Sequence, residues 1–394
     1  MNFIPPFDLN EQFKLIGEEV GAAALEILAS GRYIGGAPVD QFEQQFAQYI
    51  GTSHAIGCNS GTDALFLALR SLDIGAGDEV ITSPFTFIST AGVISAVGAK
   101  PVFIDIDPQT FNLDLNQIEA AITPRTKAII PVHLFGQPVD MTRLMAIAHS
   151  HNLWVVEDCA QSAGGTWQGK KLGSIGHIGC FSFYPTKNLG ACGDGGAMTT
   201  HDATIDAKLR MLRDHGQRQR YACETIGVNS RLDALQAVIL SIKLRHLDIW
   251  NAQRQAIADR YDSMLQPLPG IVTPQAIAGG TSVWNQYTIR LLDTDRLIDS
   301  GQVLDSGDRA KDLSQHRRDQ VRQQLQQQGI GSMVYYPIPL HLQPVYAELG
   351  YRSGDLPIAE QMAREVLSLP MFPELSLVQQ EQVVYTLKDC LIQT

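Results

Sequence analysis

One lysine, Lys187, lies in an unusual setting within FSFYPTKNL, residues 181–189, which a glycine-rich stretch, GACGDGG, follows. Most lysines lie on the solvated surface, where the ammonium has a pKa of about 10.4 and is a poor nucleophile. A desolvated pocket or a neighbouring cation lowers that pKa and lets the amine form a Schiff base with an aldehyde. Lys187 is therefore a candidate nucleophile; the alternative is a surface lysine after a Tyr-Pro turn.

Two further segments carry groups that suit a ligand. In CNSGTDAL, residues 58–65, small polar residues precede a predicted helix, so free backbone N–H groups and the hydroxyls of Ser60 and Thr62 can bind a phosphate. The alternative there is an ordinary helix N-cap. In VVEDCAQSAGG, residues 155–165, an apolar strand ends in acidic residues, where ligands of open α/β sheets bind, although an acid there can also cap the next helix.

A phosphate site, an acid at a strand end and an activated lysine together match one ligand, pyridoxal 5′-phosphate. The lysine binds its aldehyde, and the acid keeps its pyridine nitrogen protonated so that the ring accepts electrons. The segment PFTFIST, residues 84–90, supplies Phe85 and Phe87 as aromatic faces for the ring.

The elements that must position these groups alternate along the first half of the chain. Apolar spacing predicts helices over 62–72, 90–99, 115–122, 140–152 and 202–213, and strands over 78–84, 100–107, 126–136, 153–162 and 195–200. This rhythm predicts an α/β fold with a mostly parallel sheet covered on both faces.

The pattern changes in the second half. We expect a long helix from Arg231 to Tyr261, a strand over 283–292, an exposed polar insertion over 293–316, a helix over 317–329 and a last helix near 357–368. The change near residue 250 predicts a large domain over 1–250 and a smaller α+β domain over 251–394.

The composition indicates which classes of partner and which cellular compartment to expect. The 394 residues carry a formal net charge of −11, which disfavours non-specific binding to nucleic acid or to anionic membranes. Six scattered cysteines without a C-x-x-C pair predict reduced thiols and no metal site. No signal peptide or membrane span is predicted, so we expect a cytoplasmic protein.

Several motifs, in this order, resemble the DegT/StrS family of nucleotide-sugar aminotransferases, which have the aspartate aminotransferase fold (fold type I). They extend from about residue 8 to 373 and read SGRYIGGAPVDQFE, NSGTDAL, PFTFISTA, VFIDIDPQTFNLD, AIIPVHLFGQPVDM, VVEDCAQS, FSFYPTKNLGACGDGG, GVNSRLDALQA and YYPIPLHLQPVY. The resemblance implies pyridoxal 5′-phosphate as the cofactor.

The same resemblance assigns roles to the cofactor contacts. It implies that Lys187 forms the Schiff base and then acts as general base and acid, and that Asp158 pairs with the pyridine nitrogen. It further implies that Gln161 hydrogen-bonds the phenolic oxygen and that Phe87 stacks on the ring. The residues implied to bind the phosphate are Gly61, Thr62, Ser182 and, from the neighbouring subunit of a homodimer, Asn229.

The substrate side is implied in the same way. Arg231, Tyr336 and His341 would line the sugar-nucleotide site, although Arg231 can also be a surface ion pair and His341 a packed turn residue. Relatives with PIPLH often carry His-Tyr before it, whereas this chain carries Tyr335-Tyr336. Relatives with histidine in place of Lys187 dehydrate deoxysugars, so the lysine here favours transamination.

The resemblance thus predicts amino transfer from L-glutamate to a nucleotide-linked keto sugar, for O-antigen or a similar polysaccharide. The YYPIPLHLQPVY segment looks most like members that act on 3-keto sugars, with a 4-keto sugar as the main rival. A pyridoxal-phosphate lyase or dehydratase, a regulator without turnover and a free-cyclitol aminotransferase remain as alternatives. The sequence leaves the nucleotide, the sugar and the stereochemistry of the amine open.

Overall fold

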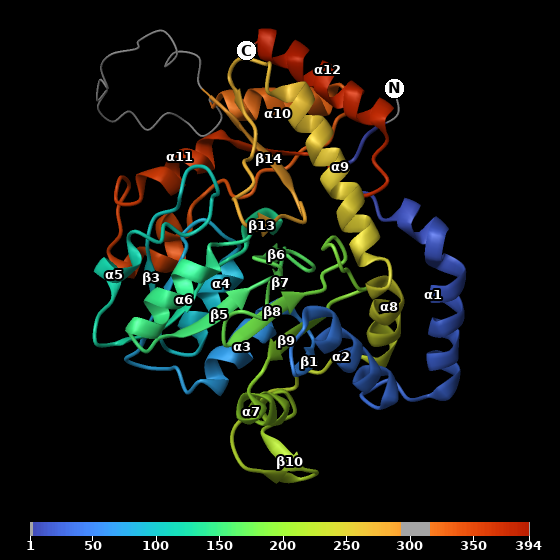
Figure 1. Cartoon of the computed structure of the whole chain (residues 1–394), viewed down its shortest axis with the longest axis vertical. Helices are drawn as coiled ribbons and strands as arrows, with labels where there is room; N and C mark the ends of the chain where they lie inside the picture. Colours follow the sequence, from blue (N-terminus) through green and yellow to red (C-terminus); the bar gives the residue numbers. More distant parts are fainter. Residues whose placement is uncertain (1–2, 293–315, 394) are drawn as a thin grey trace.

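A seven-stranded sheet lies at the centre of the computed structural model, which describes residues 3–292 and 316–393 (Figure 1). Its strand order is β1-β9-β8-β5-β4-β2-β3. The strands are β1 (His54–Cys58), β9 (Gly196–Thr200), β8 (Ile178–Ser182), β5 (Trp154–Asp158), β4 (Thr126–Ile130), β2 (Glu79–Thr82) and β3 (Lys100–Phe103). Among them β9 alone runs opposite to the other six strands, so the predicted mostly parallel α/β sheet is confirmed.

Alternate residues of these strands enter two different apolar cores. Val155 and Ile129 pack on one face with Phe42 and Phe46, whereas Val156 packs on the other face. Because successive side chains of a strand point to opposite faces, a run of apolar residues buries both faces of the sheet at once.

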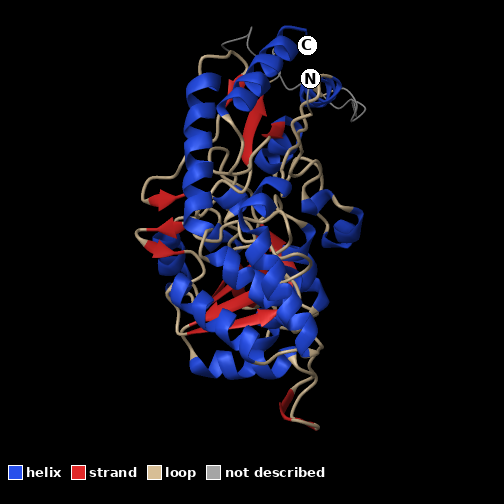
Figure 2. Cartoon of the chain, turned by 90° about the vertical axis from the view of Figure 1, so that its right-hand side faces the viewer, coloured by secondary structure: helices blue, strands red, loops and turns tan. Residues whose placement is uncertain are grey.

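Helices cover both faces of the sheet (Figures 1 and 2). The predicted helices over 62–72, 90–99, 115–122, 140–152 and 202–213 are all present, although the third is a single turn. The helices before the C-terminal part are α1 (Asn10–Ser30), α2 (Ala37–Ile50), α3 (Gly61–Ser71), α4 (Ile88–Ala96), α5 (Ile118–Ala121), α6 (Met141–Ser150), α7 (Ala203–Arg213) and α8 (Ala234–Leu244).

The C-terminal part has its own sheet and its own core. The sheet is antiparallel, in the order β12 (Ile271–Val272), β14 (Tyr287–Leu291) and β15 (Val366–Leu369). Tyr261, Tyr287 and Leu387 share a core to which Ile4 of the N-terminal segment also belongs. The helices around it are α9 (Leu247–Leu265), α10 (Arg317–Gln327), α11 (Pro357–Glu365) and α12 (Leu377–Gln393).

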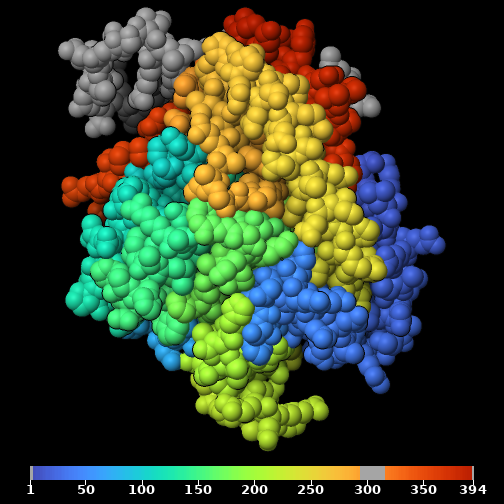
Figure 3. All heavy atoms as spheres, in the orientation of Figure 1, coloured from blue at the N-terminus to red at the C-terminus, as the bar shows by residue number. Residues whose placement is uncertain are grey.

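Short elements extend from this body. A small sheet joins β13 (Gly280–Thr281), β6 (Thr166–Trp167) and β7 (Lys170–Lys171). The hairpin of β10 (Gln217–Gln219) and β11 (Ala222–Cys223) follows α7 and projects from the lower end of the molecule (Figure 3). None of the described helices is long and apolar enough to cross a lipid bilayer.

Some expected elements differ from the structure. The predicted helix from Arg231 to Tyr261 is two helices, α8 and α9, which meet at Arg245 and His246 without a glycine or proline to mark the break. The predicted last helix near 357–368 ends at Glu365, because the next residues pair with β14 as β15. Helices α1, α2 and α12 and strands β1 and β8 were not predicted.

The domain division stays a prediction. Helix α9 runs without interruption across residue 250, where the sequence placed the boundary between 1–250 and 251–394. Almost all of the predicted polar insertion, 293–316, lies outside the described residues.

Candidate active site

The predicted cofactor residues gather at the carboxyl edge of the central sheet. Asp158 is the last residue of β5, and Ser182 is the last residue of the neighbouring parallel strand β8. Gly61 begins α3 three residues after β1 ends. Because the parallel strands end at one edge, segments far apart in the sequence come together there.

The residues predicted to bind phosphate form a tight cradle at the start of α3. Ser60 caps this helix, since its side chain accepts a hydrogen bond from the Asp63 amide at 3.1 Å. A Cβ added to Gly61 would lie 2.6 Å from the Cβ of Ser182, so only glycine allows this approach. The hydroxyl of Thr62 lies 2.7 Å from that of Ser89. Ser60 thus serves as the N-cap, and the other backbone amides of the first turn of α3 stay free to bind a phosphate.

Asp158 is held from both sides. Its Oδ2 accepts a hydrogen bond from Thr90 at 2.8 Å, and its Oδ1 accepts one from the Ala160 amide at 3.1 Å. Burial raises the pKa of this carboxyl, because desolvation outweighs these bonds and the attraction of Lys187. Such a carboxylate favours a cationic partner. Thr90 lies within the PFTFISTA motif, but no signal in the sequence indicates that this residue of the motif contacts Asp158.

Lys187 lies in a turn after β8, where its amide donates to the carbonyl of Tyr184 at 2.8 Å. Burial lowers the pKa of its ammonium to about 8, against the opposing attraction of Asp158. Within the described residues the ammonium makes no hydrogen bond, although the side chain is only partly exposed. With this pKa roughly a tenth of the amine is neutral at pH 7, far more than for an ordinary lysine.

The other ring contacts surround the same space. The Oε1 of Gln161 accepts a hydrogen bond from the Phe135 amide at 2.6 Å, and its Nε2 donates to the Tyr336 hydroxyl at 3.3 Å. Phe87 stands at the N-cap of α4 with its side chain 56% exposed, so its ring face is available for stacking. Its ring centroid lies 6.4 Å from that of Tyr336.

Asn229 and Arg231 lie together beside the phosphate cradle. Asn229 is exposed and forms a backbone bridge to Asp214, and Arg231 pairs with Asp214 at 3.1 Å. Ser230, between them, bonds the side chain of Asn59 at 3.1 Å. The arrangement matches the surface ion pair considered for Arg231, while an exposed Asn229 can still meet a second subunit.

The structure does not bring His341 to an open surface. Its side chain is fully buried, and its Nε2 lies 3.1 Å from the carboxylate of Glu360. This position matches the packed-turn alternative considered for His341, and its contact with the sugar nucleotide stays a prediction. Leu340 beside it is also buried and donates its amide to the carbonyl of Pro84, whereas Pro337 and Ile338 at the start of the PIPLH motif are exposed.

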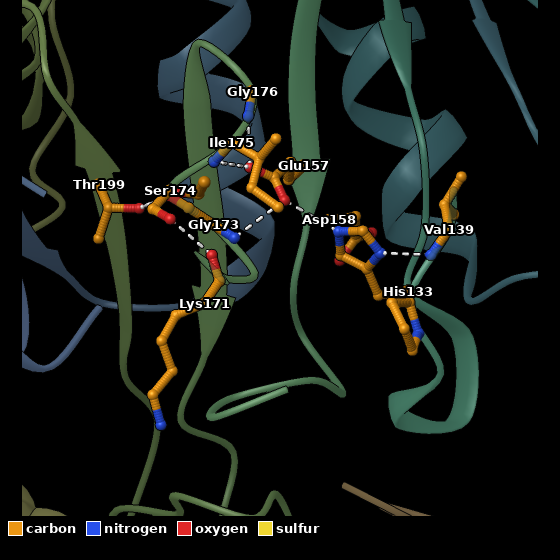
Figure 4. Close-up of polar contacts among 12 residues, drawn as sticks. His133, Val139, Glu157, Asp158, Lys171, Gly173, Ser174, Ile175, Gly176 and Thr199 are labelled. Atoms are coloured by element: carbon orange, nitrogen blue, oxygen red, sulfur yellow. Dashed lines mark hydrogen bonds and ion pairs between the residues drawn. The ribbon is translucent and has the colours of Figure 1, made fainter. Parts of the chain in front are cut away.

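A buried group behind Asp158 has the composition of a metal site. His133, Glu157 and Cys159 form the one such cluster that the described part of the chain contains. The Glu157 carboxylate accepts N–H bonds from the turn 173–176 and from His133 at 3.0 Å (Figure 4). His133 uses its other nitrogen to accept the Val139 amide at 3.1 Å. With these lone pairs engaged, the cluster joins β5 to its neighbours.

These residues fit pyridoxal phosphate on their own chemistry. Lys187 offers an amine that no residue of 3–292 or 316–393 hydrogen-bonds, Asp158 offers a buried carboxylate that favours a cation, and the helix start at Gly61 offers free amides for a phosphate.

Comparison with known proteins supports this assignment. The model of the DegT/DnrJ/EryC1/StrS aminotransferase family matches residues 14–388. A protein of Geobacillus stearothermophilus described as a pleiotropic regulatory protein is 47% identical over 383 residues, or 97% of this chain and 96% of the relative. The UDP-N-acetyl-3-dehydro-alpha-D-glucosamine 3-aminotransferase of Acidithiobacillus ferrooxidans is 46% identical over 372 residues, or 94% of each chain.

Solved structures agree with these relatives. The crystal structure of DesV of Streptomyces venezuelae in complex with a ketimine intermediate aligns with a TM-score of 0.91 and 43% identity, over 99% of this chain and 98% of DesV. Other matched structures contain the cofactor in its PMP or PLP form. The expected fold type, cofactor and aminotransferase activity are thereby confirmed. The chain belongs to the DegT/DnrJ/EryC1/StrS aminotransferase family.

Proposed function

We propose that this aminotransferase moves the amino group of L-glutamate to the keto group of a nucleotide-linked sugar, most specifically a 3-keto sugar. The observation that carries the proposal is the lysine with a lowered pKa, Lys187, beside the buried carboxylate of Asp158. The Acidithiobacillus relative, whose name specifies a 3-dehydro sugar nucleotide, supports the choice of position. The product would be an amino-deoxy sugar for O-antigen or a similar polysaccharide, made in the cytoplasm.

The residues divide the work by their chemistry. When bound, pyridoxal phosphate supplies an electron sink and a carbonyl carbon that can exchange amines. Asp158 would hold the pyridine nitrogen protonated, since a buried carboxylate is stabilised by an adjacent cation. Gln161 would orient the ring through its Nε2, which already points toward the Tyr336 hydroxyl. Phe87 would cover one ring face.

Lys187 would move the proton. Once its Nζ is free, the lowered pKa keeps part of the amine neutral, so it can take the proton from the α-carbon of the amino donor. The same ammonium can then return a proton to the carbon that receives the amine.

The second substrate and the subunit arrangement complete the proposal. Arg231 and Tyr336 would line the sugar-nucleotide site, and the enzyme would be a homodimer in which Asn229 reaches the phosphate in the neighbouring active site. If so, Asn229→Ala should release cofactor while the fold of each subunit is retained. Unchanged cofactor affinity in that variant would refute the shared site.

The decisive experiment is an absorbance spectrum of the purified protein before and after L-glutamate. Loss of the band of lysine-bound cofactor, with growth of the pyridoxamine band, would establish the first half-reaction. The amine-charged enzyme would then be mixed with 3-keto and 4-keto sugars carrying UDP, dTDP or GDP, and the product identified by mass. A spectrum that no amino donor changes would reject the proposal, as would turnover by Lys187→Ala.

The relative from Geobacillus stearothermophilus favours a second candidate, a regulatory protein that binds the cofactor without turnover. Such a protein would hold the cofactor and show no spectral change with any amino donor. The same titration therefore separates the two functions.

A further inference from the structure

Three asparagines connect the loop of Lys187 to other parts of the site; Asn188 and Asn285 are buried and Asn251 is half-buried. Asn188 follows the lysine directly and is 4% exposed. Its Nδ2 donates to the side-chain oxygen of Asn251 in α9 at 2.7 Å and to the carbonyl of Val283 at 2.8 Å. Its own oxygen accepts the Nδ2 of Asn285 at 2.8 Å. The residue beside the reacting amine is thus fixed by side chains from two other elements.

Asn285 also reaches the cofactor-ring contact Gln161 through its main chain. Its amide donates to the carbonyl of Phe135 at 2.9 Å, and the amide of Phe135 donates to Gln161 at 2.6 Å. The approach of these segments is close, because a Cβ on Gly136 would lie 2.9 Å from the Trp284 nitrogen. Phe135 and Gly136 adopt left-handed φ values of 60° and 94° in this tight turn.

The same network closes on the loop that follows Asp158. The Nδ2 of Asn251 donates to the carbonyl of Ala163 at 3.0 Å. The lysine loop, the ring-contact loop and the segment before β14 are therefore joined by side-chain amides that are buried or, at Asn251, half-buried. In such a place the loss of one bond leaves its partner unsatisfied, so the network tolerates little displacement.

We propose that Asn285 is a positioning residue for amino transfer, which sets Lys187 against Gln161 by bonding Asn188 with its side chain and Phe135 with its main chain. Asn285 touches neither the amine nor a substrate and acts through Asn188. The proposal rests on the proposed function only in taking Lys187 as the reacting amine.

The test compares Asn285→Ala, Asn188→Ala and the double variant with Gln380→Ala. Gln380 in α12 is an equally buried amide that donates to the Ile257 carbonyl at 3.0 Å, far from the site, so it controls for lost stability. Two quantities are measured: kcat and KM with L-glutamate, and the rate at which cofactor-free protein captures added pyridoxal phosphate covalently.

We expect Asn285→Ala to lower kcat and the capture rate roughly tenfold or more, with KM for L-glutamate nearly unchanged, because small displacements of reacting groups are costly. The double variant should be no worse than the worse single variant, since both remove the same bond. Gln380→Ala should keep both rates.

Rates within twofold of wild type for Asn285→Ala, losses equal to those of Gln380→Ala, or losses that multiply in the double variant would overturn the proposal. If Asn285→Ala does not fold, Asn285→Ser carries the same comparison with a smaller cavity. A wild-type protein that captures the cofactor but ignores L-glutamate would refute the proposed function, and the capture rates would still decide the role of Asn285.

Discussion

Removing the charge of Lys187 should stabilise the cofactor-free protein. Folding takes this ammonium out of water, and the pKa falls from its ordinary value of 10.5 to about 8. At about 1.4 kcal/mol per pH unit, this fall corresponds to about 3 kcal/mol lost on folding at neutral pH. Because the side chain is partly exposed, solvent screening reduces the expected value to roughly 2 kcal/mol. Lys187→Met keeps the length of the side chain and removes the cost.

The pH dependence gives the prediction its sign. Below pH 8 the lysine is charged in both the folded and the unfolded chain, so the full cost applies. Between pH 8 and 10.5 the unfolded chain binds more protons, so the stability of the wild type rises with pH and approaches that of the variant.

Urea denaturation of both cofactor-free proteins, at matched concentration and at pH 7 and 10, measures the difference. Lys127→Met, at an exposed position of β4, is the control for removing a lysine charge that folding does not bury. A Lys187→Met variant that is less stable than wild type at pH 7, or a difference that stays constant with pH, would refute the reasoning.

Three further substitutions test the surroundings of the lysine. Gly61→Ala places a Cβ 2.6 Å from that of Ser182, so the amount of cofactor retained after gel filtration should fall by about tenfold. The control Gly92→Ala adds its Cβ in open space and should retain the cofactor. Glu157→Gln replaces a carboxylate oxygen with an NH₂ group, which would face backbone amides that are themselves donors. The free energy of unfolding in urea should therefore fall by about 2–4 kcal/mol, and an unchanged midpoint would contradict this. Asp158→Asn removes the counter-charge of the pyridine nitrogen. The loss of one such electrostatic contact should slow the half-reaction with L-glutamate, followed by stopped-flow absorbance, by about a hundredfold or more.

Local motifs predicted those parts of the site that lie next to strand ends. Asp158 lies in a predicted strand and Gly61 precedes a predicted helix, so their place at the edge of a parallel sheet could be expected from the order of elements. Lys187 was singled out by its local motif alone, because β8 before it was not predicted. Long-range partners could not be predicted. Thr90 bonds Asp158 across 68 residues, and Asn285 bonds Asn188 across 97, distances over which one sequence carries no pairing signal.

Tertiary packing also decided the elements that were missed. The residues 366–369 have the apolar spacing of a helix end, but pairing with β14 makes them a strand. The burial of His341 and its pairing with Glu360 likewise depend on tertiary packing that the sequence does not indicate. The junction of α8 and α9 contains no residue that breaks helices, so the sequence indicated one continuous helix.

The pairing of β1 with β9 bears on how the protein matures during synthesis. The phosphate cradle begins where β1 ends at Cys58, yet its neighbouring strand starts only at Gly196. At 5–20 residues per second, a ribosome needs roughly 7 to 30 seconds to make the intervening segment. A nascent chain therefore leaves the backbone N–H and C=O groups of β1 without their β9 partners during that interval and offers no complete phosphate site. The protein can therefore bind cofactor only after β9 has left the ribosome and paired with β1.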